Sequence, residues 1–198
     1  ISICIFMFFG IKFLKEFTKL KQLRIGLEAE WAVGIKLNEL QQLGYNVFHD
    51  VQADNFNIDH LVVGTNGVFA IETKGRSKPL VKGKNKTREK QFNVLVKGTQ
   101  LEFPTWQDTK SVEQAIRQAK WVSNWLTKST GQEVHASAVL IVPGWFIERK
   151  EKPIIPVLPL NNLNKTFPKL LGKRVDSTTV EKICYQVEQR VKRGDDLL

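Results

Sequence analysis

The chain has 198 residues, two cysteines, and 30 Lys and Arg against 20 Asp and Glu, which gives a formal net charge of +10. This length predicts one domain with a core of ordinary size. Cys4 and Cys184 lack metal-ligand spacing, which argues against a zinc site and favours free thiols in a reducing cytoplasm. The excess of basic residues favours a polyanionic partner, either nucleic acid or an anionic lipid surface.

An apolar and basic segment over residues 1–20 is expected ahead of a single domain over residues 21–198. Residues 1–11 are largely apolar but too few to cross a bilayer, which takes about 20 residues. The basic residues that follow are Lys12, Lys15, Lys19, Lys21 and Arg24. This order is typical of the end of a membrane anchor on the cytoplasmic side. An amphipathic helix that is buried or lies at an interface is the alternative.

Residues 24–43 are predicted to form a helix that ends at Gly44. On this helix Glu30 continues the apolar stripe of Val33, Leu37 and Leu40, which is an unusual place for a carboxylate. The alternative is that Glu30 lies in the first turn of the helix, where its charge simply favours the helix dipole.

A β-hairpin is predicted around residues 58–74, after a first strand at residues 45–51. Asn66-Gly67 is a strong hairpin signal between two apolar runs. If these two residues form the loop, Asp59 pairs with Lys74. Because side chains alternate along a strand, Asp59, Glu72 and Lys74 then share one face of the sheet. One hard cation could be held between the two carboxylates, although an ordinary cross-strand ion pair of Asp59 with Lys74 is the simpler alternative.

A run of basic residues follows the hairpin directly, and it is expected to track the phosphate backbone of a nucleic acid. The candidate nucleic-acid-binding residues are Arg76, Lys78, Lys82, Lys84, Lys86 and Arg88. The alternative for such a run is a solvated loop that contacts nothing, or one that meets anionic lipid.

The rest of the chain predicts further strands and two helices. Strand segments are expected at residues 92–96, 101–103 and 136–142, and an edge strand or extended loop at residues 154–160. A helix over residues 111–126 has Ser111 and Gln114 at capping-box spacing, and a last helix begins near Ser177. The alternation of helices and strands predicts an α/β fold, a mixed sheet flanked by helices.

Three stretches of the chain carry a family resemblance. They read GLEAE at residues 26–30, NIDH at residues 57–60 and NGVFAIETKG at residues 66–75, and Gln114 follows in the later helix. Together, over roughly residues 24–145, they resemble the nuclease-related domain (NERD) family of the PD-(D/E)XK nuclease superfamily. The resemblance implies a restriction-endonuclease-like core.

The resemblance also implies an activity, that of a metal-dependent nuclease that hydrolyses DNA. Its catalytic residues would be Glu30, Asp59, Glu72, Lys74 and Gln114. Asp59, Glu72 and the backbone carbonyl of Thr73 would hold Mg²⁺, with Mn²⁺ as a substitute. The expected partners are DNA and an anionic membrane surface, in the cytoplasm or at the cytoplasmic face of the membrane. The alternative is a non-catalytic module that binds nucleic acid or a membrane surface and retains the nuclease fold.

Overall fold

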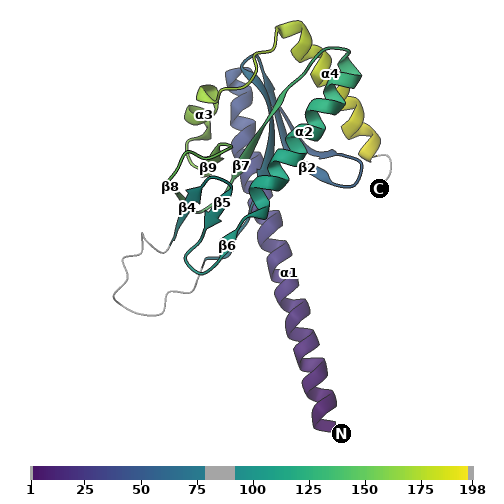
Figure 1. Cartoon of the computed structure of the whole chain (residues 1–198). Helices are drawn as coiled ribbons and strands as arrows, with labels where there is room; N and C mark the ends of the chain where they lie inside the picture. Colours follow the sequence, from purple (N-terminus) through teal and green to yellow (C-terminus); the bar gives the residue numbers. More distant parts are fainter. Residues whose placement is uncertain (1, 79–91, 196–198) are drawn as a thin grey trace.

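The computed structural model describes residues 2–78 and 92–195, and its centre is a five-stranded mixed sheet (Figure 1). The strand order is β1-β2-β3-β7-β9, in which β1, β2 and β3 are antiparallel neighbours while β7 and β9 run parallel to β3. The bounds are Asn46–Gln52 for β1, Asn57–Gly64 for β2, Gly67–Thr73 for β3, Ala136–Ile141 for β7 and Val157–Leu158 for β9. The strands predicted at residues 45–51 and 136–142 are therefore confirmed, as is an edge strand within residues 154–160.

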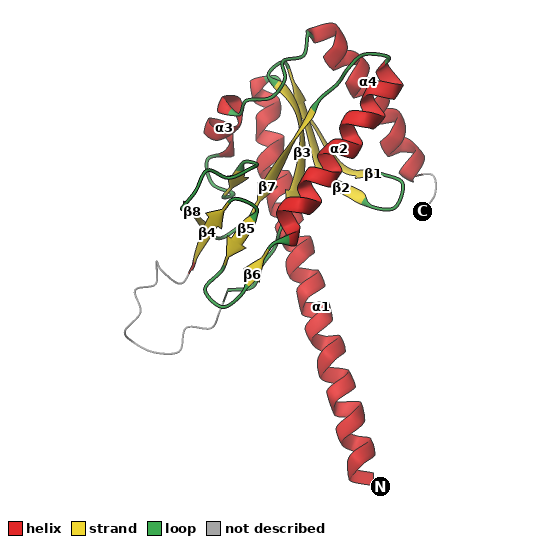
Figure 2. Cartoon of the chain, viewed as in Figure 1, coloured by secondary structure: helices red, strands yellow, loops and turns green. Residues whose placement is uncertain are grey.

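Helices cover both faces of this sheet (Figure 2). One face packs on α2 (Lys110–Thr130) and α4 (Ser177–Asp195), and the other on α1 (Ser2–Asn38), η1 (Glu39–Leu43), α3 (Leu163–Thr166) and η3 (Phe167–Lys169). The alternation along β2 divides the core, because Leu61 and Val63 face α2 while Val62 faces α1. The predicted α/β fold is confirmed.

A second, four-stranded sheet lies beside the main one, in the order β6-β5-β4-β8. Its strands are β4 (Asn93–Lys97), β5 (Gln100–Glu102), β6 (Gln107–Asp108) and β8 (Phe146–Arg149). The sequence predicted β4 and β5 as strand segments but neither β6 nor β8. Because β6 leads directly into α2, this small sheet sets where α2 begins.

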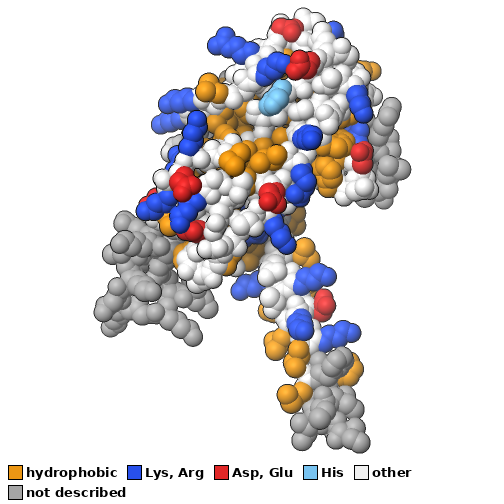
Figure 3. Space-filling model, viewed as in Figure 1, with side chains coloured by type: hydrophobic (Ala, Val, Ile, Leu, Met, Phe, Trp, Pro, Cys, Tyr) orange, Lys and Arg blue, Asp and Glu red, His pale blue; other side chains and the backbone are white. Residues whose placement is uncertain are grey.

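Helix α1 is one continuous helix of 37 residues that projects from the domain (Figure 1). Its C-terminal part packs on the sheet through Val33 and Leu37, which are fully buried. Large exposed side chains run along the helix: Phe13, Phe17, Leu20, Leu27, Trp31 and Ile35. Figure 3 shows apolar and basic side chains together on the projecting part. Within the described ranges, no helix carries an apolar stretch long enough to cross a bilayer.

The hairpin of β2 and β3 has a different register from the predicted one. Gly64 pairs with Gly67, so Thr65 and Asn66 form the loop, and extension of the ladder places Asp59 opposite Glu72. The prediction that Asp59 pairs with Lys74 is therefore wrong. The register differs by two residues, so every side chain keeps its predicted face. Contacts from outside the hairpin hold this turn, because the Thr65 carbonyl accepts the Val175 amide at 3.1 Å.

Candidate functional site

Acidic side chains from four elements gather at one end of the main sheet. Asp59 on β2 and Glu72 on β3 are neighbours on the face that packs on α2, and Glu72 is only 2% exposed. Glu30 approaches from α1 and Asp50 from β1, close enough for their charges to act on one another. Because Glu30 lies well inside a helix that begins at Ser2, the alternative that it occupies the first helical turn is wrong.

The electrostatics of this cluster disfavour several negative charges at once. Burial raises the pKa of Asp59 to about 7, and the charges of Glu72 and Glu30 act in the same direction. A hydrogen bond of 2.7 Å from the Thr73 amide to Asp59 Oδ2 opposes that rise. Burial also raises the pKa of Glu30, followed by the charges of Glu72 and Asp50. A bound cation would relieve the repulsion among these carboxylates.

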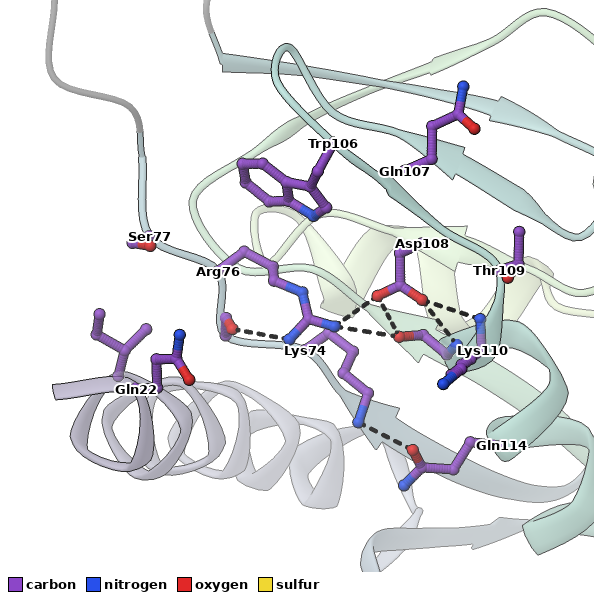
Figure 4. A pocket seen from close by; sticks show the side chains of 13 residues that line it. Gln22, Lys74, Arg76, Ser77, Trp106, Gln107, Asp108, Thr109, Lys110 and Gln114 are labelled. Carbon is purple, nitrogen blue, oxygen red and sulfur yellow. Dashed lines mark hydrogen bonds and ion pairs between the residues drawn. The ribbon is translucent and has the colours of Figure 1, made fainter. Parts of the chain in front are cut away.

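Glu72 has one oxygen in an ion pair and the other without a partner. Oε1 lies 2.5 Å from Lys74 Nζ. The same ammonium donates to Gln114 Oε1 at 3.1 Å, as Figure 4 shows. Oε2 is buried and accepts no hydrogen bond from the described residues. A buried carboxylate oxygen without a partner is costly, which makes it a ready ligand for a cation.

The donor set fits a hard divalent cation that keeps part of its water shell. In residues 2–78 and 92–195, no three His, Cys, Asp or Glu side chains are arranged to hold a metal ion together. The available donors are therefore two carboxylates, Asp59 and Glu72, with backbone oxygen and water. Mg²⁺ is commonly bound by one or two carboxylates and several waters, whereas a structural zinc site needs four protein ligands.

The five predicted catalytic residues, Glu30, Asp59, Glu72, Lys74 and Gln114, come together at this end of the sheet. Lys74 pairs with Glu72 rather than with Asp59, so the simple cross-strand pair is not what forms. Gln114 contacts Lys74 directly, a partner that its sequence position did not indicate. It does not form the predicted capping box either, because Asp108 accepts the first amides of α2.

The predicted nucleic-acid-binding residues fall into two groups. Arg76 forms an ion pair of 2.5 Å with Asp108, and the Lys78 ammonium lies 4.5 Å from the centre of the Phe92 ring. Lys82, Lys84, Lys86 and Arg88 lie outside the described residues.

Sequence reasoning missed Asp50 as a neighbour of the site. It has φ of 50°, which is rare for a residue other than glycine, and Asn57 Nδ2 donates to its side chain at 2.7 Å. The strand alternation breaks there, since Phe48 and Val51 both contact the core beneath α2. Nothing in the local sequence signals this irregularity. The capping role of Asp108 could have been predicted, because an Asp just before a helix commonly accepts the first backbone amides of that helix.

Comparison with known proteins assigns the family. The model of the nuclease-related domain matches residues 25–143, which is more than half of the chain and includes Glu30, the β2–β3 hairpin and Gln114. Neither a curated protein nor a solved structure gives a significant match. The nuclease-related domain is part of the PD-(D/E)XK-like nuclease group. The length of the match, over a mixed sheet flanked by helices, shows that this chain belongs to the nuclease-related domain (NERD) family.

Proposed function

We propose that this protein hydrolyses DNA phosphodiester bonds with Mg²⁺ as its cofactor and Mn²⁺ as a substitute. The observation that supports this most directly is the state of Glu72, which shares one oxygen with Lys74 and leaves the other buried without a partner. Beside it, Asp59 has a raised pKa because of burial and of Glu72 itself. A carboxylate pair of this kind is suited to a cation and poorly suited to a purely structural role.

Each residue then has a definite task. Asp59 and Glu72, with the carbonyl of Thr73, would hold the cation, and Glu30 would complete the acidic cluster. When bound, the cation supplies positive charge to the phosphate and makes a nearby water more acidic. Lys74 stabilises the charge that develops on the phosphate or orients the attacking water, as a compact point charge. Gln114 and Glu72 hold the Lys74 ammonium in place for that task.

Binding of DNA is attributed to the basic residues that follow β3. The net charge of +10 supports a polyanionic partner. Arg76 and Lys78 follow Lys74 closely in the chain, just after the end of β3, which places them beside the acidic site. The more distal Lys82, Lys84, Lys86 and Arg88 are assigned the same task from the sequence alone.

Association with an anionic membrane surface at the cytoplasmic face is a further part of the proposal. It is supported by the exposed Phe13 and Phe17 of α1, which lie among Lys12, Lys15 and Lys19. A helical segment that exposes apolar and basic side chains together can bind anionic lipid through both.

The test of catalysis is cleavage of plasmid and of single-stranded DNA by purified protein with Mg²⁺, with Mn²⁺ and with chelator. Glu72→Gln keeps the size of the side chain but removes its charge, and it should lower Mg²⁺-dependent cleavage by at least about 100-fold. DNA binding should change little, because basic residues supply it. Glu28→Gln is the matched control, because Glu28 is an exposed residue of α1 whose ion pair in the described part of the chain is with Arg24.

Undiminished cleavage by Glu72→Gln would refute the assignment of the site. If the unchanged protein binds DNA but cleaves none with either ion, the alternative of a non-catalytic module is correct.

A further inference from the structure

A cavity of about 640 Å³ lies directly beside Lys74 (Figure 4). Its walls come from α1, from the chain that leaves β3, and from the stretch that runs from Trp106 through β6 into the first turns of α2. Lys74 and Gln114 line the cavity and also belong to the acidic site, so the two share a wall. The lining also includes Gln22, Arg76, Trp106, Asp108 and Lys110. Anything bound here lies next to the groups proposed to act on a phosphate.

The charge of the lining favours an anion. Three cationic residues line the cavity, Lys74, Arg76 and Lys110. Asp108 pairs with Arg76, and Glu72 of the acidic site pairs with Lys74. Both oxygens of Asp108 are already engaged. Oδ1 accepts the amides of Lys110 and Ser111 at 3.0 Å, and Oδ2 accepts Arg76 at 2.5 Å and the Ser111 hydroxyl at 2.7 Å. After these two ion pairs, the charge of Lys110 remains, and it suits a phosphate group.

Trp106 adds an aromatic surface to this polar lining. Its ring is stacked on Phe103 with centroids 4.4 Å apart and an interplanar angle of 9°, and it meets Trp145 nearly at a right angle with centroids 5.9 Å apart. Phe103 and Trp145 are buried, whereas Trp106 is only partly buried and lines the cavity. These two aromatic neighbours restrict the orientation of Trp106, so that less side-chain entropy is lost when a ligand binds.

A flat aromatic ring beside lysine and arginine is the combination that binds single-stranded nucleic acid, because every base can stack and every phosphate is charged. In a duplex, the stacked neighbours cover both faces of each base, so neither face is available to Trp106. The cavity volume lies within the range that holds one small organic ligand, which admits a nucleotide but not a duplex.

We propose that this cavity binds an unpaired nucleotide of the DNA strand next to the scissile phosphate, with its base stacked on Trp106. The substrate is then single-stranded DNA, or duplex DNA that is locally unpaired. This inference rests on the proposed nuclease function, since it uses Lys74 as the shared wall between cavity and site. It assigns Arg76 and Lys110 to the phosphates that flank the bound nucleotide.

The first test is binding, which needs no catalysis. A short fluorescent single-stranded DNA and its duplex are titrated with the whole 198-residue chain by fluorescence anisotropy, with Ca²⁺ in place of Mg²⁺. The single strand should bind more tightly than the duplex. Trp106→Leu keeps apolar contact with Phe103 but removes the aromatic face, and it should weaken single-strand binding by about tenfold, within the range of base stacking on an aromatic ring. Trp106→Phe should retain most of the affinity, and Trp106→Leu should leave duplex binding nearly unchanged.

Trp121→Leu is the matched control, because Trp121 is a partly buried Trp of α2 that stacks on Trp125 and is not among the residues that line the cavity. Melting temperatures of all variants show whether Trp106→Leu is folded. Should it unfold, an abasic nucleotide placed along the single strand replaces the variant, and one position should lose affinity for the unchanged protein.

Equal affinity for single strand and duplex, with no effect of Trp106→Leu or of any abasic position, would overturn the inference. Cleavage assays separate it from the nuclease proposal. If Trp106 governs single-strand binding but no DNA is cleaved with Mg²⁺ or Mn²⁺, the cavity assignment holds and the nuclease proposal fails. If Trp106→Leu cleaves single strands and duplexes as well as the unchanged protein does, the nuclease proposal holds and the cavity assignment fails.

Discussion

Two acceptors hold the Lys74 ammonium, Glu72 Oε1 at 2.5 Å and Gln114 Oε1 at 3.1 Å. Gln114→Leu removes one of them and should lower kcat by about tenfold with little change in KM, because it disturbs the position of the ammonium proposed to be catalytic rather than substrate binding. Gln114→Glu keeps an acceptor oxygen and should restore most of the rate. The measurement is steady-state cleavage at saturating Mg²⁺.

A change confined to KM, or equal losses in Gln114→Leu and Gln114→Glu, would instead assign Gln114 to substrate contact. Stability of the three proteins should be compared at the same time, since Gln114 lies on a helix that packs on the main sheet.

Asp108 joins the start of α2 to the chain that leaves β3. Burial acts to raise its pKa, but hydrogen bonds from Arg76 and Ser111 outweigh it and hold the pKa below its ordinary value of 3.8. Asp108→Ala should cost about 1–2 kcal/mol of unfolding free energy at neutral pH, as the loss of a helix cap does. As pH falls, Asp108 takes up a proton in the unfolded chain before it does so in the folded protein, because its pKa is lower in the folded protein. The stabilisation that the ionised Asp108 gives the folded protein is therefore complete above about pH 4 and is lost as pH falls through the lowered pKa.

Urea unfolding of the native protein and of Asp108→Ala at neutral and acidic pH measures this effect. The difference between the two should narrow as pH falls through the lowered pKa of Asp108. Asp108→Asn keeps a neutral cap, so its unfolding free energy should lie between those of the native protein and Asp108→Ala and should depend less on pH. A difference that stays constant from pH 7 to acid would mean that the charge of Asp108 contributes nothing.

The β2–β3 hairpin depends on Gly67. This residue has φ of 147°, and a Cβ atom there would come within 2.9 Å of the Gly172 Cα. Gly67→Ala should therefore destabilise the protein by at least about 2 kcal/mol, through backbone strain and the clash together. Gly98→Ala is the control, because Gly98 also has positive φ, 55°, but nothing lies within 4 Å of its Cβ position.

Chemical denaturation of both variants measures the difference. The Gly98 variant should lose only about 1 kcal/mol. Equal losses would show that the φ angle alone, and not the contact with Gly172, makes Gly67 necessary.

Local patterns predicted most elements and the faces that they bury. The apolar run at residues 136–142 is a buried strand, and the stripe of Val33, Leu37 and Leu40 packs on the sheet as expected. Glu30 was identified as a candidate because it continues the same stripe. The alternation of side chains correctly placed Asp59 and Glu72 on one face of the sheet, even though the predicted register was wrong. These properties depend on neighbours in the sequence, which is why the sequence alone revealed them.

Features fixed by distant parts of the chain were not predictable in this way. The Asn66-Gly67 signal was overridden because the Val175 amide and the backbone of Gly172 hold a different turn. The pair of Arg76 with Asp108 and the parallel pairing of β4 with β8 join segments that no local pattern connects. The wall of the Trp106 cavity therefore emerged only from the tertiary structure.

The whole molecule has a compact domain and a helix that projects from it with exposed apolar side chains (Figure 3). If α1 binds anionic membranes, the paired substitution of Phe13 and Phe17 by Ser should weaken binding to vesicles that contain phosphatidylserine by at least about tenfold, because each buried Phe contributes about 1.5–3 kcal/mol. Phe146→Ser, at an exposed Phe of β8, is the control. Cosedimentation with vesicles measures the effect.

Vesicles of phosphatidylcholine alone should bind less protein, since they lack the charge that attracts Lys12, Lys15 and Lys19. Equal sedimentation of the native protein and the paired variant would remove α1 from the membrane proposal.

The continuity of α1 has a mechanical consequence. Phe13 and Glu30 lie on one unbroken helix, and a rise of 1.5 Å per residue separates them by about 26 Å along its axis. A flexible linker between Phe13 and Glu30 would allow the acidic site to take many positions relative to the end of α1. A rigid rod instead fixes the distance between the acidic site and the end of α1 that is held, and the direction in which the site faces. An anchored molecule can then reach only strands that pass at that distance from the held end, which would limit cleavage by geometry rather than by affinity.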